Sequence, residues 1–439
     1  MANTRKLQNR NFRAIIIGGG PVGLTVANSL DRAGLDYLVA ERYPTITSES
    51  GAGILLWPHS LRVFHQLGLL ENCEGRYVPL KYKTNMNLHG KEMQTMPVFS
   101  SMGENHGYEG KNSPRPQLLR TLYEGLGGKT EKIRTGVSIE DIEMGNHGVR
   151  VRLSDGSVEK GSIVVGADGV HSMTRAIMQR LAKEAGRDFA SEEDPMVATY
   201  QIMYGRAKTT ANSDFNTFFE THGTYRSTQV SADKDRGYFA IYRKLPKPTT
   251  DLKYEYTSSE IAEFVNAFSD VMVMPRLSFQ ELYANREWTR LVNQHEGRAK
   301  HWYFGRVVLV GDASVQMTAA AGMGVNTGIQ SAVALVNKIY EVLSAETEPD
   351  TETFARAFAA YQEIRRTESR LVCEMAAQVM RVNTWDSYLS WFLGDVVIPW
   401  TMSNEKMAMQ VGNEFIRNAH KLDFIEIEFR SGKIPWGSS

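Results

Sequence analysis

The sequence predicts an α/β fold in which a β-rich domain is inserted into a domain built on a parallel sheet, with a helical region at the C-terminus. Three observations support this fold class. An apolar strand, a glycine-rich turn and a helix follow one another near the N-terminus. The middle of the chain holds strand-like runs rich in threonine, tyrosine and phenylalanine. Helical spacing of apolar residues dominates from Asn326 onward.

The first predicted unit is a strand, a helix and a second strand. Phe12–Ile17 is a short apolar run closed by glycine, which is typical of a parallel strand buried on both faces. Val22–Ala33 has apolar residues at helical spacing and stops at Gly34, a suitable C-cap. Tyr37–Ala40 then predicts the second strand, which ends at Glu41.

Helices and strands alternate in the next part of the chain. Helices are predicted at Leu61–Leu70 and Pro116–Leu126, and the Asp-Gly turn in SDGS predicts a hairpin from Val149–Leu153 to Val158. Further strands are predicted at Ser162–Val165, Val197–Tyr204, Thr217–Glu220, Gly237–Tyr242 and Val307–Val310.

These elements divide the 439 residues into joined domains. Residues 1–190 and 300–345 are predicted to form one domain in two parts. Residues 191–299 are predicted to form the inserted β-rich domain, and residues 346–439 a helical region. The split follows from Val307–Val310, where buried-strand character returns and again runs into a glycine.

The turn after the first strand reads Gly18-x-Gly20-x-x-Gly23, and each glycine has a physical reason to be there. The first permits a tight turn, the second lets a pyrophosphate approach the backbone, and the third lets the helix pack close to the strand. The pyrophosphate would then accept hydrogen bonds from free N–H groups at the positive end of the helix. Glu41, at the end of the second strand, can accept hydrogen bonds from ribose hydroxyls.

Two later motifs also follow strands. In GADGVHS, Asp168 could bind a ligand or simply cap the next helix. Gly311-Asp312 precedes a glycine-rich segment that opens a helix, and an aspartate there could hold sugar-alcohol hydroxyls.

The three motifs in this order resemble the FAD-dependent hydroxylase and epoxidase superfamily with a para-hydroxybenzoate-hydroxylase-like fold. The chain is most similar within it to fungal FAD-dependent monooxygenases of terpenoid and indole-alkaloid pathways, and the resemblance extends to about residue 345. Besides the first glycine motif, the stretches that carry it are GAGILLWPHSLRVFHQLGL (Gly51–Leu69), SPRPQLLRTLY (Ser113–Tyr123), GADGVHSMTR and GDASVQMTAAAGMGVNTGIQSAVAL (Gly311–Leu335).

The resemblance implies a Rossmann-like FAD-binding domain and a β-rich substrate domain. It implies that NAD(P)H binds transiently as co-substrate, without a Rossmann domain of its own. It also implies that O2 supplies an oxygen atom to epoxidise or hydroxylate a bulky apolar molecule, a terpenoid or a prenylated indole. It assigns no catalytic residue, and NADH and NADPH are both candidates.

The same resemblance implies the cofactor contacts. Gly18, Gly20 and Gly23 would hold the pyrophosphate, and Glu41 the adenosine ribose with Arg42 nearby. The other implied contacts are Gly53 along the flavin, Arg115 at the linker region, Asp168 for both FAD and NAD(P)H, and Asp312, Gly324 and Val325 at the ribitol and isoalloxazine.

Three positions depart from the family pattern. After the late strand, Val315 and Ala319 stand where a histidine and a proline are common. In the middle domain Gln201 follows Tyr200 where relatives often carry a catalytic arginine. One interpretation is drift within a working monooxygenase. The alternative is a protein that holds its flavin and catalyses a cyclisation or isomerisation, and a third reading is a non-enzymatic binding protein.

Composition excludes several other classes. Lys plus Arg equals Asp plus Glu at 50 each, so no general attraction to nucleic acid is expected. Two cysteines and scattered histidines predict neither a disulfide framework nor a metal site. The polar N-terminus and the lack of a long apolar run predict a cytoplasmic protein without a transmembrane segment. Tyr388–Trp400 is predicted to be a buried helix and turn, with membrane-surface association as the alternative.

Overall fold

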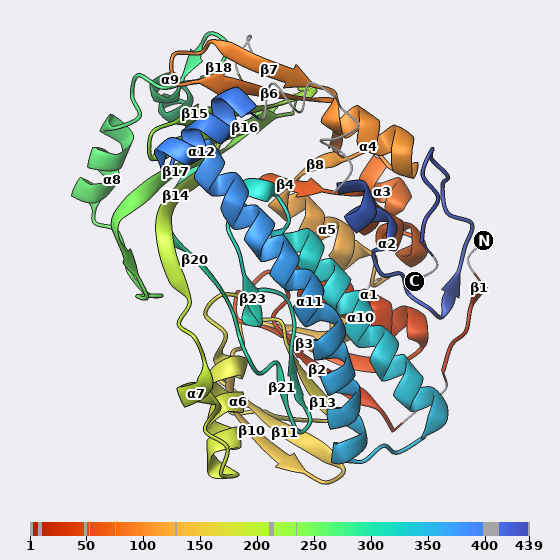
Figure 1. Ribbon diagram of the computed structural model, residues 1–439. Helices are drawn as coiled ribbons and strands as arrows, with labels where there is room; N and C mark the ends of the chain where they lie inside the picture. The colour runs from red at the N-terminus through yellow and green to blue at the C-terminus, as the bar shows by residue number, and fades with distance from the viewer. Residues whose placement is uncertain are drawn as a thin grey trace.

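A six-stranded sheet, counted over the residues that the structure describes, forms one of two large layers in the computed structural model (Figure 1). Those residues are 3–7, 11–47, 51, 53–74, 76–127, 130–209, 215–233, 235–397 and 412–437. The strand order is β21-β22-β13-β2-β3-β9, parallel except for β21. The strands are β21 (Tyr303–Phe304), β22 (Val307–Leu309), β13 (Ile163–Gly166), β2 (Arg13–Ile17), β3 (Asp36–Glu41) and β9 (Ile133–Thr135).

Strand β2 is buried on both faces, as its continuous apolar run predicts. Ala14 and Ile16 join the core on the side of α1 (Pro21–Ala33) and α10 (Gly324–Ala345). Ile15 and Ile17 pack instead against a small antiparallel sheet and α6. These covering elements are β10 (Ile139–Gly145), β11 (Gly148–Leu153), β12 (Val158–Gly161) and α6 (Met173–Glu184).

The predicted first helix is confirmed with small changes at its start. Helix α1 begins at Pro21, whose fixed φ and missing N–H suit the first helical position, and it ends where Gly34 adopts a left-handed φ of 76°. The single helix predicted over Leu61–Leu70 is wrong. Gly68 takes a φ of 73° and ends α2 (Pro58–Leu67), and α3 (Leu70–Glu74) begins after it.

An eight-stranded sheet, again counted within the described residues, forms the second large layer. Its order is β23-β20-β14-β17-β16-β15-β6-β7, antiparallel except where β6 runs parallel to β15. Strands β6 and β7 come from outside residues 191–299, so the sheet extends beyond the predicted insert. The strands are β23 (Val315–Gln316), β20 (Arg286–Arg298), β14 (Val197–Lys208), β17 (Arg236–Thr249), β16 (Arg226–Ala232), β15 (Thr217–Gly223), β6 (Tyr82–Asn87) and β7 (Glu92–Met96).

Shorter elements complete the two layers. One face of the eight-stranded sheet packs on α8 and α9 through a core of phenylalanine, valine and methionine. The remaining elements are α4 (Val98–His106), α5 (Arg115–Glu124), α7 (Phe189–Glu192), α8 (Ser258–Asn266), α9 (Phe279–Ala284), β1 (Asn3–Thr4), β4 (Gly53–Leu56), β5 (Val78–Pro79), β8 (Lys111–Pro114), β18 (Met272–Met274), β19 (Leu277–Ser278) and β24 (Ile425–Glu426).

Two long helices connect the layers. Figure 1 shows α10 and α11 (Thr351–Asn383) lying side by side, with α11 reaching the large sheet. The buried helix predicted over Tyr388–Trp400 is wrong for its first turns, and residues 398–400 of that range lie outside the described residues. In α12 (Tyr388–Phe392) no side chain is buried, and Tyr388 is 79% exposed. Membrane-surface association through α12 stays a prediction, which sedimentation with phospholipid vesicles would test. Among the described residues, no helix is both long and apolar enough to cross a bilayer.

Candidate functional site

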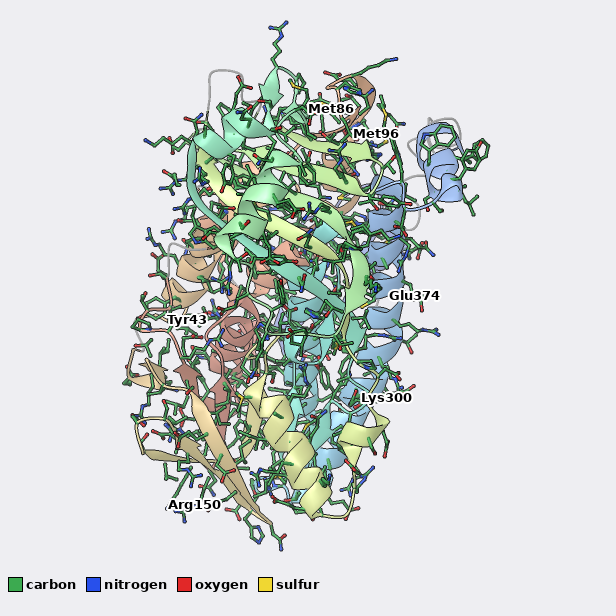
Figure 2. All side chains as sticks on the ribbon, turned by 90° about the vertical axis from the view of Figure 1, so that its left-hand side faces the viewer. Tyr43, Met86, Met96, Arg150, Lys300 and Glu374 are labelled. Atoms are coloured by element: carbon green, nitrogen blue, oxygen red, sulfur yellow. The ribbon has the colours of Figure 1, made fainter. Side chains whose placement is uncertain are left out.

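A cavity of about 2560 Å³ lies between the two large sheets and is lined by both. Sites for one drug-sized ligand usually measure roughly 300–1,000 Å³, so this cavity has room for a large cofactor and a substrate together. It begins at the carboxyl ends of β2 and β13, where open α/β sheets bind their ligands. In Figure 2 Met96 lies near the top of the molecule and Tyr43 about halfway down, and both line the cavity. Residues at both of these heights therefore contribute to the cavity lining.

The three glycines of the first motif meet three different surroundings. Gly18 has a φ of +106°, and a Cβ there would lie 2.5 Å from the carbonyl oxygen of Ala167. A Cβ on Gly23 would overlap the carbonyl oxygen of Gly18, because α1 packs directly on the turn. A Cβ on Gly20 would meet nothing within 4 Å. Only Gly20 therefore opens onto free space in front of the helix N-terminus, where a pyrophosphate would fit.

Glu41 closes this turn from the second strand. It is 8% exposed, and its Oε2 accepts a hydrogen bond of 2.6 Å from the Gly19 N–H. Its Oε1 accepts one of 2.9 Å from the Tyr43 N–H. An ionised carboxylate has about four acceptor positions, so Glu41 can still accept from ribose hydroxyls. Burial lowers the pKa of Arg115, whereas the negative charge of the neighbouring Glu41 opposes this shift. The Arg42 guanidinium lies over the Tyr43 ring.

Asp168 lines the cavity, but its carboxylate is engaged by the start of α6. Oδ1 accepts from the Ser172 hydroxyl at 2.6 Å, and Oδ2 accepts from the N–H and the hydroxyl of Thr174 at 2.9 and 3.0 Å. The Asp168 carboxylate therefore caps the start of α6, as one of the two alternatives for this motif predicted. Three of its about four acceptor positions are used within the loop, and Asp168 still faces the cavity.

The Gly311-Asp312 motif lies beside the turn at Gly18–Gly23 because a side chain of α1 packs against it. Val22 of α1 fits against Gly311 and Gly328, and at each of these a Cβ would crowd the valine methyl groups. The following helix, α10, begins at Gly324, where a Cβ would meet nothing within 4 Å. Gly324 and Val325 both line the cavity. Two helix N-termini thus open onto the same space.

Asp312 precedes this helix and opens into the cavity. The Asp312 side chain is exposed to the cavity space, but protein atoms enclose that space, and this environment raises the pKa of Asp312 to about 6. A hydroxyl-rich ligand in the cavity could donate hydrogen bonds to this carboxylate in place of water.

The three departures from the family pattern fall in different places. Ala319 lines the cavity, whereas Val315 is 5% exposed and belongs to the hydrophobic core. Gln201 faces the other side of the sheet, beside Arg243 and Tyr256. Neither Val315 nor Gln201 is among the described residues that line the cavity. Of the three substitutions, Ala319 is the one in a position to act directly on a bound ligand.

The substrate side of the cavity contains polar residues that sequence reasoning missed. Arg290 on β20, and Lys83, His222 and Gln229 near the far edge of the same sheet, all line the cavity. Alternation along the strands is the one signal that could have grouped them, because residues two apart share a face. Of the tyrosines in this sheet, Tyr204, Tyr238 and Tyr242 line the cavity, whereas Tyr225 is an exposed turn residue.

The residues present fit a dinucleotide such as FAD. Open backbone at Gly20 and Gly324 leaves room for the ligand at two positive helix ends, and Glu41 and Asp312 supply hydroxyl acceptors. No group of three or more potential metal ligands occurs within the described part of the chain.

Comparison with known proteins agrees with this geometry. Residues 11–367 match the family described as FAD binding domain. The chain is 36% identical over 443 residues to the FAD-dependent monooxygenase srdH of Neurospora crassa, covering 97% of this chain and 98% of that protein. It is 27% identical over 441 residues to the FAD-dependent monooxygenase ausM of Penicillium brasilianum, covering 98% of this chain and 90% of that protein.

Solved structures share the fold. Klebsiella pneumoniae HpxO in complex with FAD and uric acid matches with a TM-score of 0.75 at 21% identity, over 93% of this chain and 97% of that one. PyrE3, described as a Diels-Alderase of pyrroindomycin biosynthesis, matches with a TM-score of 0.69 at 19% identity, over 92% of this chain and 80% of that one.

Proposed function

Because the chain belongs to the FAD binding domain family of flavin-dependent monooxygenases, we propose that it uses NAD(P)H and O2 to epoxidise or hydroxylate a bulky apolar natural-product intermediate, a terpenoid or a prenylated indole. The observation that carries this proposal is the cavity, which continues from the two open helix N-termini into a largely apolar chamber. Bound FAD would supply the redox chemistry, and the protein would supply binding, orientation and exclusion of water.

The chain's own residues would divide this work. The open backbone at Gly20 would hold the pyrophosphate, with Gly18 and Gly23 shaping the turn, and Glu41 would accept from the adenosine ribose. The remaining proposed cofactor contacts are Arg42, Gly53 and Arg115 along one side of the cavity, Asp168 in the loop before α6, and Asp312, Gly324 and Val325 at the ribitol and flavin.

The opposite wall would bind the substrate. Apolar residues of the eight-stranded sheet, of α4 and of α11 face the same chamber, and this lining favours a hydrophobic molecule. Representative residues are Phe99, Met102, Ile202, Phe218, Val292 and Val379.

The mass of the product tests this proposal. Purified FAD-loaded protein should oxidise NAD(P)H faster when its pathway substrate is present, and the product should gain the mass of one oxygen atom. Labelled O2 should place the label in that product. If the loaded protein neither oxidises NAD(P)H in response to substrate nor incorporates label, the monooxygenase proposal is wrong.

A second candidate is a cyclase or isomerase that only holds its flavin. Ala319 on the cavity wall favours it, because relatives often carry proline at this position beside the flavin, and PyrE3 shares the fold. An isomeric product formed without NAD(P)H would support this candidate. A pure binding protein, the third reading, would leave product formation in the host unchanged when cavity residues are replaced.

Cofactor retention should depend on pH through Asp312. Its pKa of about 6 in the free protein means that the carboxylate is ionised at pH 7 and takes up a proton as the pH falls through 6. Because the ionised form accepts ribitol hydrogen bonds better, FAD affinity should fall about tenfold between pH 7 and pH 5. Flavin fluorescence titration at each pH measures this.

Asp312→Asn is the matched control, because it keeps the shape and cannot ionise. The variant should bind FAD more weakly at pH 7 and lose most of the slope below it. An identical pH profile in the variant and in the wild type would show that another group titrates.

A further inference from the structure

A charged cluster interrupts the apolar wall of the substrate chamber. It consists of Lys83 on β6, Glu220 and His222 on β15, and Gln229 on β16. Asn85 pairs in register with Glu220 on one side, and Gln229 pairs with it on the other. Since residues two apart on a strand share a face, all of these side chains lie on the same face of the sheet. Burying charged groups in an apolar wall costs free energy unless they are paired.

Glu220 is fully buried, and three side chains contact its carboxylate. Its Oε2 contacts the Lys83 ammonium and lies 3.4 Å from Nε2 of His222, and its Oε1 accepts from Nε2 of Gln229 at 2.6 Å. Burial raises the pKa of Glu220, but Lys83 and His222 outweigh it and lower the pKa to about 2. The Lys83 ammonium therefore balances the charge of the Glu220 carboxylate.

The orientation of His222 leaves one nitrogen unused. Because a carboxylate can only accept, Nε2 carries a hydrogen and donates to Glu220. In the singly protonated ring, Nδ1 is then an acceptor. The residue is 3% exposed and lines the cavity, yet within the described part of the chain Nδ1 has no hydrogen-bond partner. Oδ1 of Asn85, another acceptor on the cavity wall, also lacks a partner among the described residues.

The cluster is tied to the loop at the expected flavin edge. Nε2 of Gln229 also donates to the carbonyl oxygen of Ala320 at 2.7 Å, and the Tyr242 hydroxyl donates to Oε1 of Gln229 at 2.9 Å. Ala320 lies four residues before Gly324, the start of α10. A ligand group bound at the cluster would therefore be held close to that loop.

We propose that His222 and Asn85 form a polar subsite for a neutral hydrogen-bond donor, an O–H or N–H group, on an otherwise apolar substrate. An acceptor such as an ether or ester oxygen would face two more acceptors, and an ion would upset the charge balance of Lys83 and Glu220. This inference rests on the proposed function, because it assumes that the apolar chamber holds the substrate.

Two matched ligand pairs test the subsite in the FAD-loaded protein. The first pair is 3-geranylindole and its N-methyl derivative, and the second is geranylgeraniol and its methyl ether. Dissociation constants come from the change in the flavin absorption spectrum. At least one donor-bearing molecule should bind about tenfold more tightly than its methylated partner, as expected for one hydrogen bond to a buried acceptor.

His222→Phe should bring this ratio to about one by weakening the donor-bearing molecule alone. Asn85→Leu provides a second variant in case His222→Phe does not fold. It should also reduce the ratio, and it should keep or raise the melting temperature, because it removes a buried amide oxygen that has no partner among the described residues. Ser231→Ala is the control. It removes a hydroxyl elsewhere on the cavity lining of the same sheet, so it should leave the ratio unchanged.

Equal affinities within both pairs in the wild type, or a ratio that neither variant alters, would overturn the subsite. If the methylated molecules bind equally well and still stimulate NAD(P)H oxidation, the subsite fails while the proposed function stands. If none of the four molecules binds, the subsite and the apolar-substrate proposal fail together.

Discussion

Gly20→Val should yield a folded protein that has lost its FAD. The backbone at Gly20 has φ −72° and ψ 178°, an extended conformation that valine readily adopts. A Cβ there meets no protein atom within 4 Å, so the side chain would enter the cavity in front of α1 without disturbing the fold. It would occupy the space through which a pyrophosphate reaches the helix N-terminus. We expect FAD affinity to fall by about 100-fold or more, which corresponds to roughly 2.7 kcal/mol.

The ratio of flavin to protein absorbance after purification, and a fluorescence titration of the flavin-free protein, measure this loss. The melting temperature of the flavin-free variant should match that of the flavin-free wild type. Gly20→Ala is a graded control, because its single methyl group should weaken FAD binding less than valine does. A yellow Gly20→Val protein with wild-type affinity would show that the cofactor does not bind against this turn.

Gly23→Ala should have the opposite pattern and destabilise the fold itself. Its Cβ would overlap the carbonyl oxygen of Gly18, and both partners are backbone that is held between β2 and α1. No flexible side chain can move aside, so the turn and the helix must separate. We expect a loss of about 3 kcal/mol or more in the free energy of unfolding, measured by urea denaturation of the flavin-free protein.

Gly324→Ala is the matched control for this change. It is also a glycine-to-alanine replacement at the start of a helix beside the cavity, but its Cβ would meet nothing within 4 Å. The unfolding free energy of the flavin-free variant should stay within about 0.5 kcal/mol of the wild type. If Gly23→Ala proved equally harmless, close packing of α1 on the turn would not be what requires glycine there.

The residues near the first turn could be predicted because they are neighbours in the chain. The strand, the turn, helix α1 and Glu41 interact over about 30 residues, so glycine spacing and apolar periodicity describe them well. The same local reasoning failed at Gly68, where one glycine in a left-handed conformation divides a predicted helix into α2 and α3. A glycine inside an apolar run can be either a helix residue or a cap, and periodicity does not distinguish the two.

The substrate wall could not be predicted in this way. Strands β6 and β7 join the inserted sheet from a distant part of the chain, and this pairing brings Lys83 to Glu220. Strand alternation decides that Gln201 faces away from the cavity while Tyr204 lines it, and sequence spacing does not say which face is which.

The sequence by itself therefore determined the α/β class, the family and the turn that would hold the cofactor, because each depends on short contiguous motifs whose backbone chemistry is local. Only the tertiary structure decided which side chains form the chamber beside it. That choice depends on strand pairing and register between distant segments, and it buries Val315 while bringing His222 and Asn85 to the cavity.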